Sequence, residues 1–280
     1  MAEGVAGHFK GHGKGNVLVT GGSAGIGRAC VERFARETGW NVWFTYHRGA
    51  ARAEELVSRL GKRPDGGEVR AFPLSQGDWE SHQSLLARLP GPVDVLVNNA
   101  AVGSKTVEQH APGPAHTKAA AFFRINAVGP LWLIEQLLPG MLERGRGKIV
   151  NIASVGGGVG QFPGFHRADG MSKAALAYLT RHLAAELVHS PVHVFALCPG
   201  AVDTGMFEAS TLRALSPEGR AAFTARLPQG RLIEPEEIAE LVWFLAGEHS
   251  APLHGAVLDA SMGLGVHPGL LTALPPAPGE

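Results

Sequence analysis

Cysteine and tyrosine are scarce in this chain of 280 residues, and each scarcity removes a class of chemistry. The two cysteines, Cys30 and Cys198, have no metal-type partner nearby in the sequence, which excludes a disulfide scaffold and a cysteine-based zinc site. Their small number also fits the reducing cytoplasm. The two tyrosines, Tyr46 and Tyr178, leave few positions that can supply a phenol group.

The chain also lacks an excess of charge and any long apolar run. Lys and Arg together number 25, as do Asp and Glu, so no basic surface predicts a nucleic-acid partner. No stretch of about 18 apolar residues is present, so we expect no membrane span. The first fifteen residues lack the apolar region of a secretory signal. We therefore expect a cytoplasmic protein that acts on a small-molecule substrate without a metal ion.

What the chain does contain is an alternation of short apolar runs and helical patterns. Continuous apolar strands between helices are typical of a parallel sheet that helices cover on both faces. The predicted fold is therefore α/β, a single doubly wound, mainly parallel sheet. We expect one domain over residues 16–265, a flexible segment over 1–15 and a proline-rich tail over 266–280. The expected strands are 17–20, 41–45, 68–72, 93–97, 148–152, 192–197 and 256–259, and the expected helices are 26–37, 50–60, 79–89, 119–143, 172–188 and 235–246.

A glycine-rich turn, TGGSAGIG at residues 20–27, follows the first expected strand and opens the first expected helix. Glycines allow a tight turn and let the backbone approach a pyrophosphate closely. The N-terminus of the helix adds free N–H groups and the positive end of its dipole. This turn predicts a dinucleotide site, and the residues that we expect to contact the cofactor are Gly21, Ser23, Gly25, Ile26 and Gly27.

The glycine turn and four later stretches together resemble the short-chain dehydrogenase/reductase family over about residues 15–265. The resemblance implies a Rossmann-type fold and an oxidoreductase that uses a nicotinamide dinucleotide. In that family Ser154 would hold the polar group of the substrate, Lys173 the nicotinamide ribose, and Asn126 a water or a helix kink. The stretches are Asn98-Asn99-Ala100-Ala101, Ile125-Asn126-Ala127, Ser154 and Pro199-Gly200 with Thr204. The cofactor contacts that they imply are Asn98, Ala100, Lys173, Pro199, Gly200 and Thr204.

One position departs from this family's pattern of a tyrosine four residues before a lysine. Asp169 stands at the tyrosine position before Lys173, and neither tyrosine of the chain is placed to replace it. We expect the ammonium to lower the pKa of Asp169 below about 3.9, which would make it a paired anion and a poor proton donor. Three interpretations follow: Asp169 is a weak base or an anchor for a cation, His166 supplies the proton, or redox chemistry is lost. In the last case the chain is a lyase, an isomerase or a regulatory protein.

An anionic Asp169 would suit one substrate class better than others. An imine nitrogen is basic enough to be protonated before hydride arrives, so its iminium form needs a nearby anion and no acid. If the chain is a reductase, this reasoning favours substrates that carry a basic nitrogen at or near the reacting centre. The alternative is that Asp169 only caps the helix expected at 172–188.

The loop after the second strand indicates which dinucleotide is used. Residues 45–49 include no acid to bond a ribose 2′-hydroxyl, whereas Arg48 can pair with a 2′-phosphate and Arg28 lies where it can assist. We therefore expect NADP(H). The alternative is that Arg48 is a solvated loop charge. The end of the third strand, residues 72–75, lacks the aspartate by which the family contacts adenine.

Two segments, 101–118 and 203–229, are free to form the substrate pocket. The second contains apolar residues that would either close as a lid over the nicotinamide or pack as a helical hairpin. The family resemblance also implies a homotetramer or homodimer that pairs through the helices at 119–143 and 172–188 and through residues 256–262. The apolar residues of the second segment are Met206, Phe207, Leu212, Leu215 and Phe223.

Overall fold

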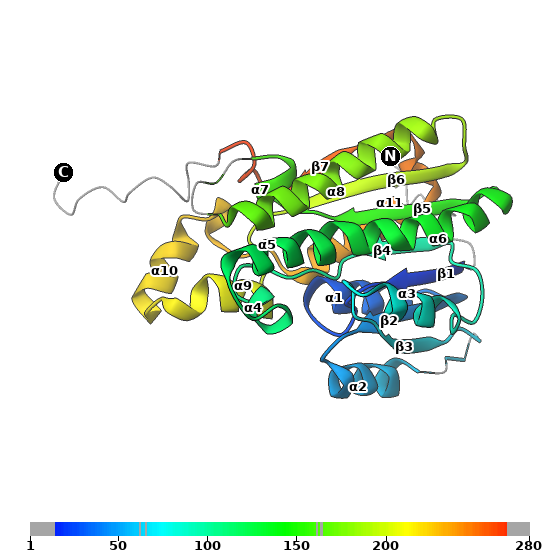
Figure 1. Ribbon diagram of the computed structural model, residues 1–280, viewed down its shortest axis with the longest axis horizontal. Helices are drawn as coiled ribbons and strands as arrows, with labels where there is room; N and C mark the ends of the chain where they lie inside the picture. Colours follow the sequence, from blue (N-terminus) through cyan, green and yellow to red (C-terminus); the bar gives the residue numbers. More distant parts are fainter. Residues whose placement is uncertain (1–14, 62, 65, 161, 163–164, 268–280) are drawn as a thin grey trace, which may run out of the picture.

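One sheet of seven parallel strands runs through the part of the chain that the computed structural model describes, residues 15–61, 63, 64, 66–160, 162 and 165–267 (Figure 1). The strand order is β3-β2-β1-β4-β5-β6-β7, and each neighbouring pair is parallel. The order reverses between β1 and β4, so the sheet is doubly wound. The strands are β1 (Gly15–Val19), β2 (Trp40–Tyr46), β3 (Val69–Pro73), β4 (Val95–Asn98), β5 (Gly147–Ile152), β6 (Val192–Pro199) and β7 (Val257–Ala260).

Helices cover both faces of the sheet and enclose two apolar clusters. Val17 and Val19 of β1 belong to the cluster under α1, α2 and α11, whereas Leu18 belongs to the cluster under α3, α6 and α8. Both faces of β1 are therefore buried, which explains its continuous apolar sequence. The predicted fold class is confirmed. These helices are α1 (Gly25–Ala35), α2 (Ala50–Leu60), α3 (Trp79–Leu86), α6 (Gly129–Glu143), α8 (Arg167–Glu186) and α11 (Pro235–Ala246).

Shorter helices follow β4, β5 and β6, beyond the carboxyl ends of these strands. In Figure 1, α4, α9 and α10 lie at the same end of the molecule. The rings of Phe207 and Phe223 lie 6.1 Å apart, and Arg220 pairs with Glu208 at 2.7 Å, so α9 and α10 contact each other. The lid and the hairpin both remain predictions. The short helices are α4 (Val107–His110), α5 (Ala115–Phe123), α7 (Val155–Gly158), α9 (Gly205–Ser210) and α10 (Pro217–Ala225), with 3-10 turns at Leu212–Ala214, Pro228–Gly230 and Glu248–Leu253.

Two helices begin several residues earlier than the sequence predicts. The helix expected at 119–143 begins earlier, as α5, and reaches α6 through a π-helical turn at Arg124–Val128. The π-helical turn lies directly before Gly129-Pro130, and Pro130 fits the first turn of α6 because a residue there needs no backbone donor. Helix α8 begins at Arg167, not at residue 172. Its first turn contains Gly170, where α8 approaches α7 so closely that a Cβ would lie 3.2 Å from the Gly156 carbonyl oxygen.

The expected flexible segment and proline-rich tail fall mainly outside the described residues. Gly15 is the first residue of β1, and the described part ends at residue 267. Within the described part, no helix is both long and apolar enough to cross a bilayer. The expectation of a single domain over 16–265 stays a prediction.

Candidate active site

The glycine turn connects β1 to α1 and is held from the side by β2. The backbone N–H of Gly21 donates to Thr45 Oγ1 at 3.1 Å, and that of Gly22 donates to the Thr45 carbonyl oxygen at 2.8 Å. Gly21 has a φ of +67°, which L side chains rarely adopt. A Cβ on Gly27 would lie 2.3 Å from the Gly21 carbonyl oxygen. The turn therefore needs glycine for its own geometry.

Helix α1 begins at this turn with its first N–H groups available to a ligand. Its N-cap, Ala24, makes no side-chain capping bond, and its first turn carries no acidic residue. Ser23, beside the cap, is 7% exposed, and Ile26 packs against the core. An eleven-residue helix whose uncapped N-terminus follows a close-packed glycine turn fits the diphosphate of a dinucleotide.

The end of β4 supplies a second wall of this site. The backbone N–H groups of Asn99 and Ala100 both donate to Thr20 Oγ1 at 2.9 Å, and Ala100 lies against Gly21. Asn98 instead faces the interior, where its Nδ2 donates to Asn151 Oδ1 at 2.9 Å. Of the expected β4 contacts, Ala100 lies at the glycine turn and the Asn98 side chain lies inside the sheet layer. Asn99, which was not predicted as a site residue, donates from its Nδ2 to the Thr20 carbonyl oxygen.

The segment after β6 closes the turn from another side. Thr204 lies 3.1 Å from a Cβ built on Gly25, so this segment contacts the glycine turn directly. Its Oγ1 accepts from the Phe207 N–H at 3.2 Å and caps α9. Gly200, after Pro199, is close-packed, since a Cβ there would lie 3.0 Å from that of Ser261. The structure thus brings these expected cofactor residues to the same edge as the turn.

Ser154, Asp169 and Lys173 come together where α7 packs on α8. Ser154 caps α7 after β5, and its Oγ accepts from the Gly156 N–H at 3.3 Å. A Cβ on Gly157 would lie 2.5 Å from that of Lys173, so α7 and α8 are in close contact. Lys173 Nζ donates to the Ile152 carbonyl oxygen, at the end of β5, at 2.8 Å. The packing of α7 on α8 therefore brings Ser154 and the helix that carries Asp169 and Lys173 to the region beyond the end of β5.

Asp169 lies inside the first turn of α8, with only 5% of its surface exposed. Burial raises the pKa of its carboxyl above the ordinary value and outweighs the lowering by Lys173, by His166 and by hydrogen bonds from Ser104. Burial also lowers the pKa of the Lys173 ammonium. The expected lowering of the Asp169 pKa is therefore wrong in direction, because loss of water outweighs the neighbouring charge.

The expected capping role of Asp169 is also wrong, and its attraction to Lys173 is not a direct ion pair. Among the ion pairs within the described residues, none joins Asp169 to Lys173, whose Nζ is directed to the Ile152 carbonyl. The N-cap of α8 is His166, three residues earlier, so Asp169 does not occupy the capping position. His166 is exposed, and its ring lies 5.0 Å from that of Phe122. Of the two candidate proton donors, only Asp169 is enclosed.

Met206 of α9 and Asp169 both lie close to Gly103 in the loop after β4. The Cγ and Sδ atoms of Met206 lie 3.3 Å from a Cβ built on Gly103, and Asp169 Oδ2 lies 3.9 Å from the same point. The loop after β4, with Gly103 and Ser104, thus lies next to both α9 and Asp169. Ser104 was missed from the sequence, and only its position shortly after the asparagine motif pointed to it.

Asn126 joins three elements around this site from within the π-helical turn. It is 1% exposed, and its Oδ1 accepts from the Val102 N–H at 2.8 Å. Its Nδ2 donates to the Val102 carbonyl oxygen and to Ser172 Oγ, both at 3.0 Å. Ser172 Oγ in turn donates to the Asp169 carbonyl oxygen at 2.7 Å. Asn126 therefore fixes the loop after β4 to the first turn of α8.

The loop after β2 carries the residues expected to select the dinucleotide. Arg48 is exposed and donates to the Gln109 carbonyl oxygen, whereas Arg28 is engaged by Glu32 and Glu55. Arg52, in the first turn of α2, was missed. Its Nη2 lies 2.9 Å from a Cβ built on Gly49, and Ser23 Oγ lies 2.7 Å from that point. Arg52 is thus closer to the glycine turn than its sequence position suggested.

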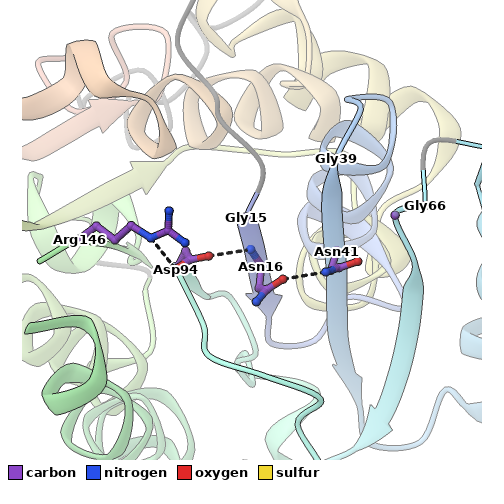
Figure 2. A pocket seen from close by; sticks show the side chains of 8 residues that line it. Gly15, Asn16, Gly39, Asn41, Gly66, Asp94 and Arg146 are labelled. Carbon is purple, nitrogen blue, oxygen red and sulfur yellow. Dashed lines mark hydrogen bonds and ion pairs between the residues drawn. The ribbon is translucent and has the colours of Figure 1, made fainter. Parts of the chain in front are cut away.

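A shallow pocket of about 300 Å³ lies at the opposite end of the strands (Figure 2). Asp94 lines this pocket between Arg146 and Asn16 (Figure 2), and it accepts from the Asn16 N–H at 3.0 Å and from Arg146 Nε at 3.2 Å. The carboxylate is therefore used to join the amino ends of β1, β4 and β5. Ligands of doubly wound sheets bind at the carboxyl ends, where the glycine turn and Asp169 lie.

Comparisons with known proteins identify relatives over most of this chain. Residues 21–265 match a family model described as enoyl-(acyl carrier protein) reductase. An acetoacetyl-CoA reductase of Allochromatium vinosum is 33% identical over 257 residues, which cover 89% of this chain and 98% of the relative. A 3-oxoacyl-(acyl-carrier-protein) reductase of Thermotoga maritima is 31% identical over 252 residues, with coverage of 88% and 96%.

Two solved structures extend the likeness to three dimensions. Actinorhodin polyketide ketoreductase with NADPH has a TM-score of 0.78 at 32% identity, over 90% of this chain and 97% of that chain. A short chain dehydrogenase/reductase family protein has a TM-score of 0.74 at 32% identity with the same coverage. The likeness thus spans the glycine turn, the Ser154 region and the lid segment together.

Proposed function

Because this chain belongs to the short-chain dehydrogenase/reductase family and is an oxidoreductase of that type, we propose that it reduces a small ketone with NADPH and uses Asp169 where the family has tyrosine. One observation carries the proposal. Asp169 is buried one helical turn before Lys173, and its pKa is raised. A carboxyl group in that state can hold a proton and deliver it.

The residues at the carboxyl edge have the chemistry that a nicotinamide dinucleotide requires. In this proposal the N–H groups of the turn and of α1 bind the diphosphate, and Lys173 binds the ribose at the nicotinamide end. Bound there, the dinucleotide supplies the hydride. Asn98 would contribute indirectly, because its bond to Asn151 holds the end of β4 in place. The residues of the turn, β4 and β6 that we propose to bind the cofactor are Gly21, Ser23, Gly25, Ile26, Gly27, Asn98, Ala100, Pro199, Gly200 and Thr204.

NADP(H) is proposed as the cofactor because basic groups gather beside the second strand. Arg48 and Arg52 lie on this rim, and the loop between β2 and α2 contains no acidic residue. A 2′-phosphate can be bound by such groups, whereas a ribose 2′-hydroxyl is usually bonded by an acid. The ketoreductase structure named above contains NADPH, and an angucycline C-6 ketoreductase of 29% identity contains NADP.

The substrate we propose is a ketone, such as the 3-oxo group of an acyl thioester. Ser154 would orient the carbonyl oxygen, and Asp169 would donate a proton to the alkoxide that forms as hydride reaches the carbon. The relatives named above are an acetoacetyl-CoA reductase and a 3-oxoacyl-(acyl-carrier-protein) reductase, so we favour a ketone over an imine. The named relatives are reductases, which favours this reaction over a lyase, an isomerase or a regulatory role.

Two further parts of the proposal concern the protein as a whole. We propose a homodimer or homotetramer that pairs through α6 and α8, where Tyr178 is 70% exposed on α8. Light scattering that gives only the mass of one chain, 29.4 kDa, would contradict this. The two free, buried cysteines are consistent with a cytoplasmic location.

The test is the oxidation of NADPH with acetoacetyl-CoA as substrate, followed by absorbance across pH for the wild type, Asp169→Asn and Asp169→Tyr. We expect wild-type turnover to fall as pH rises through the pKa of Asp169, because the proton is then lost. Asp169→Asn should lose roughly 10²–10⁴-fold in kcat, the usual contribution of a general acid. Asp78→Asn, at a partly exposed position away from the site, is the matched control.

Two results would overturn the proposed role of Asp169. Full turnover by Asp169→Asn, with an unchanged pH profile, would show that the carboxyl group moves no proton. Turnover of cyclic imines but not of ketones by the wild type, abolished in Asp169→Asn, would show that the anion is the active form. Asp169→Tyr should retain ketone reduction and extend it to higher pH, since a phenol loses its proton later.

A further inference from the structure

Two histidines from distant parts of the chain face each other beside Arg48. His47, after β2, and His110, at the end of α4, have ring centroids 4.9 Å apart at an interplanar angle of 27°. Next to them, Arg48 donates to the carbonyl oxygen of Gln109 in α4. Two separate contacts therefore join the loop after β2 to the segment after β4.

This contact connects the two sides of the glycine turn. Strand β1 lies between β2 and β4 in the sheet. Thr45 of β2 holds Gly21 from one side, and Ala100, after β4, lies against Gly21 from the other. The paired imidazoles consequently lie beside the turn to which we assign the dinucleotide.

The surroundings of the two imidazoles oppose their protonation. Burial lowers the pKa of His47, with a further contribution from Arg48. Burial also lowers the pKa of His110, and His47 and Arg48 add to this. On α4 the neighbouring Glu108 is paired with Lys118 of α5, so it is already neutralised, and α2 adds the positive charge of Arg52.

An anion at this rim would reverse that balance. A phosphate group beside Arg48 offsets the repulsion between the guanidinium and a protonated imidazole, and each protonated ring can donate a charge-assisted hydrogen bond to phosphate oxygens. We propose that His47 and His110 recognise the 2′-phosphate of the dinucleotide together with Arg48, and that they take up a proton when this phosphate binds. The inference rests on the NADP(H) preference proposed above and adds its proton coupling.

Proton uptake predicts two measurable results. Binding of NADPH should take up more protons than binding of NADH, which lacks the 2′-phosphate. The affinity ratio of NADPH to NADH should also rise as pH falls from about 8 to about 6, through the ordinary pKa of histidine. A bare phosphate near Arg48 would act oppositely, because the guanidinium lowers the pKa of the phosphate and a proton is released.

The experiment is calorimetric titration of the full chain with NADPH and with NADH, in buffers of different ionisation enthalpy, at pH 6, 7 and 8. His47→Phe and His110→Phe keep a flat ring in the stack but remove its proton. His189→Phe, at an exposed position after α8, is the matched control. At pH 6 we expect each stack variant to lose about tenfold in NADPH affinity, with NADH affinity and control unchanged.

Each outcome decides between the inference and the proposed cofactor. Loss of NADPH-linked proton uptake in both stack variants, with the preference for NADPH reduced at pH 6, supports the inference. A wild type that prefers NADPH, with stack variants that bind and take up protons as it does, overturns the inference and leaves the proposed cofactor standing. A wild type that binds NADH as tightly as NADPH from pH 6 to 8 rejects the NADP(H) proposal and the inference with it.

Discussion

Replacing Asn126 by alanine should destabilise this protein far more than the loss of one polar side chain usually does. The amide of Asn126 satisfies both backbone groups of Val102, which is itself 2% exposed. Each buried group left without a partner costs about 1–3 kcal/mol. Ser172 Oγ keeps its bond to the Asp169 carbonyl, so it adds little. We expect a loss of about 2–6 kcal/mol, a large part of the usual stability of about 5–15 kcal/mol.

The measurement is urea unfolding at a fixed protein concentration, followed by tryptophan fluorescence, for which the chain has five tryptophans. Asn41→Ala is the matched control, because Asn41 also makes two side-chain hydrogen bonds but at a partly exposed position. We expect Asn41→Ala to cost less than about 1 kcal/mol. If the two variants lose the same small amount, water replaces the Asn126 amide, and its bonds to Val102 are not what holds the loop after β4 in place.

Other consequences follow from single positions. Gly27→Ala should weaken dinucleotide binding roughly tenfold or more, since its Cβ would lie 2.3 Å from the Gly21 carbonyl oxygen. Gly205→Ala, whose Cβ would have nothing within 4 Å, should bind the dinucleotide as the wild type does. Fluorescence titration compares the two variants, and equal affinities would contradict the close-packed turn. Burial lowers the pKa of His193 to about 4, with help from Lys148 and His254, so the folded chain keeps this ring neutral. Stability from His193 is then complete above about pH 6.5 and falls as pH drops towards 4, and thermal melts of His193→Gln should lose less between pH 7 and 5 than melts of the wild type or of His189→Gln.

The sequence predicted the parts of this protein that local rules determine. The strand positions followed from short apolar runs, and the glycine turn followed from residues whose small size is needed at the position they occupy. Helices α2 and α11 have the predicted bounds, because polar faces and proline signals mark their ends.

What the sequence did not predict depends on burial and on contacts between distant segments. Burial raises the pKa of Asp169, contrary to expectation, and this burial depends on segments distant in the sequence, such as the loop with Gly103 and Ser104. The inward orientation of Asn98 depends on Asn151 of the neighbouring strand. The start of α8 at Arg167 could not be predicted from the sequence, because glycine disfavours a helix and the packing of Gly170 against Gly156 is visible only in the structure.

The π-helical turn at Arg124–Val128 also sets the rotational phase of two helices. Each residue of an α-helix rotates the side-chain direction by about 100° about the helix axis. The wider π-helical turn therefore lets α5 and α6 continue as one helix while their side chains are rotated relative to each other. Helix α5 can then direct Phe122 towards Ala168, while α6 directs Leu133 towards the sheet. Deleting one residue here would keep the rod helical and yet rotate one half by about 100°, which moves Asn126 off Val102. A change of even one residue in the length of this segment would therefore disturb the site, although the segment is helical throughout.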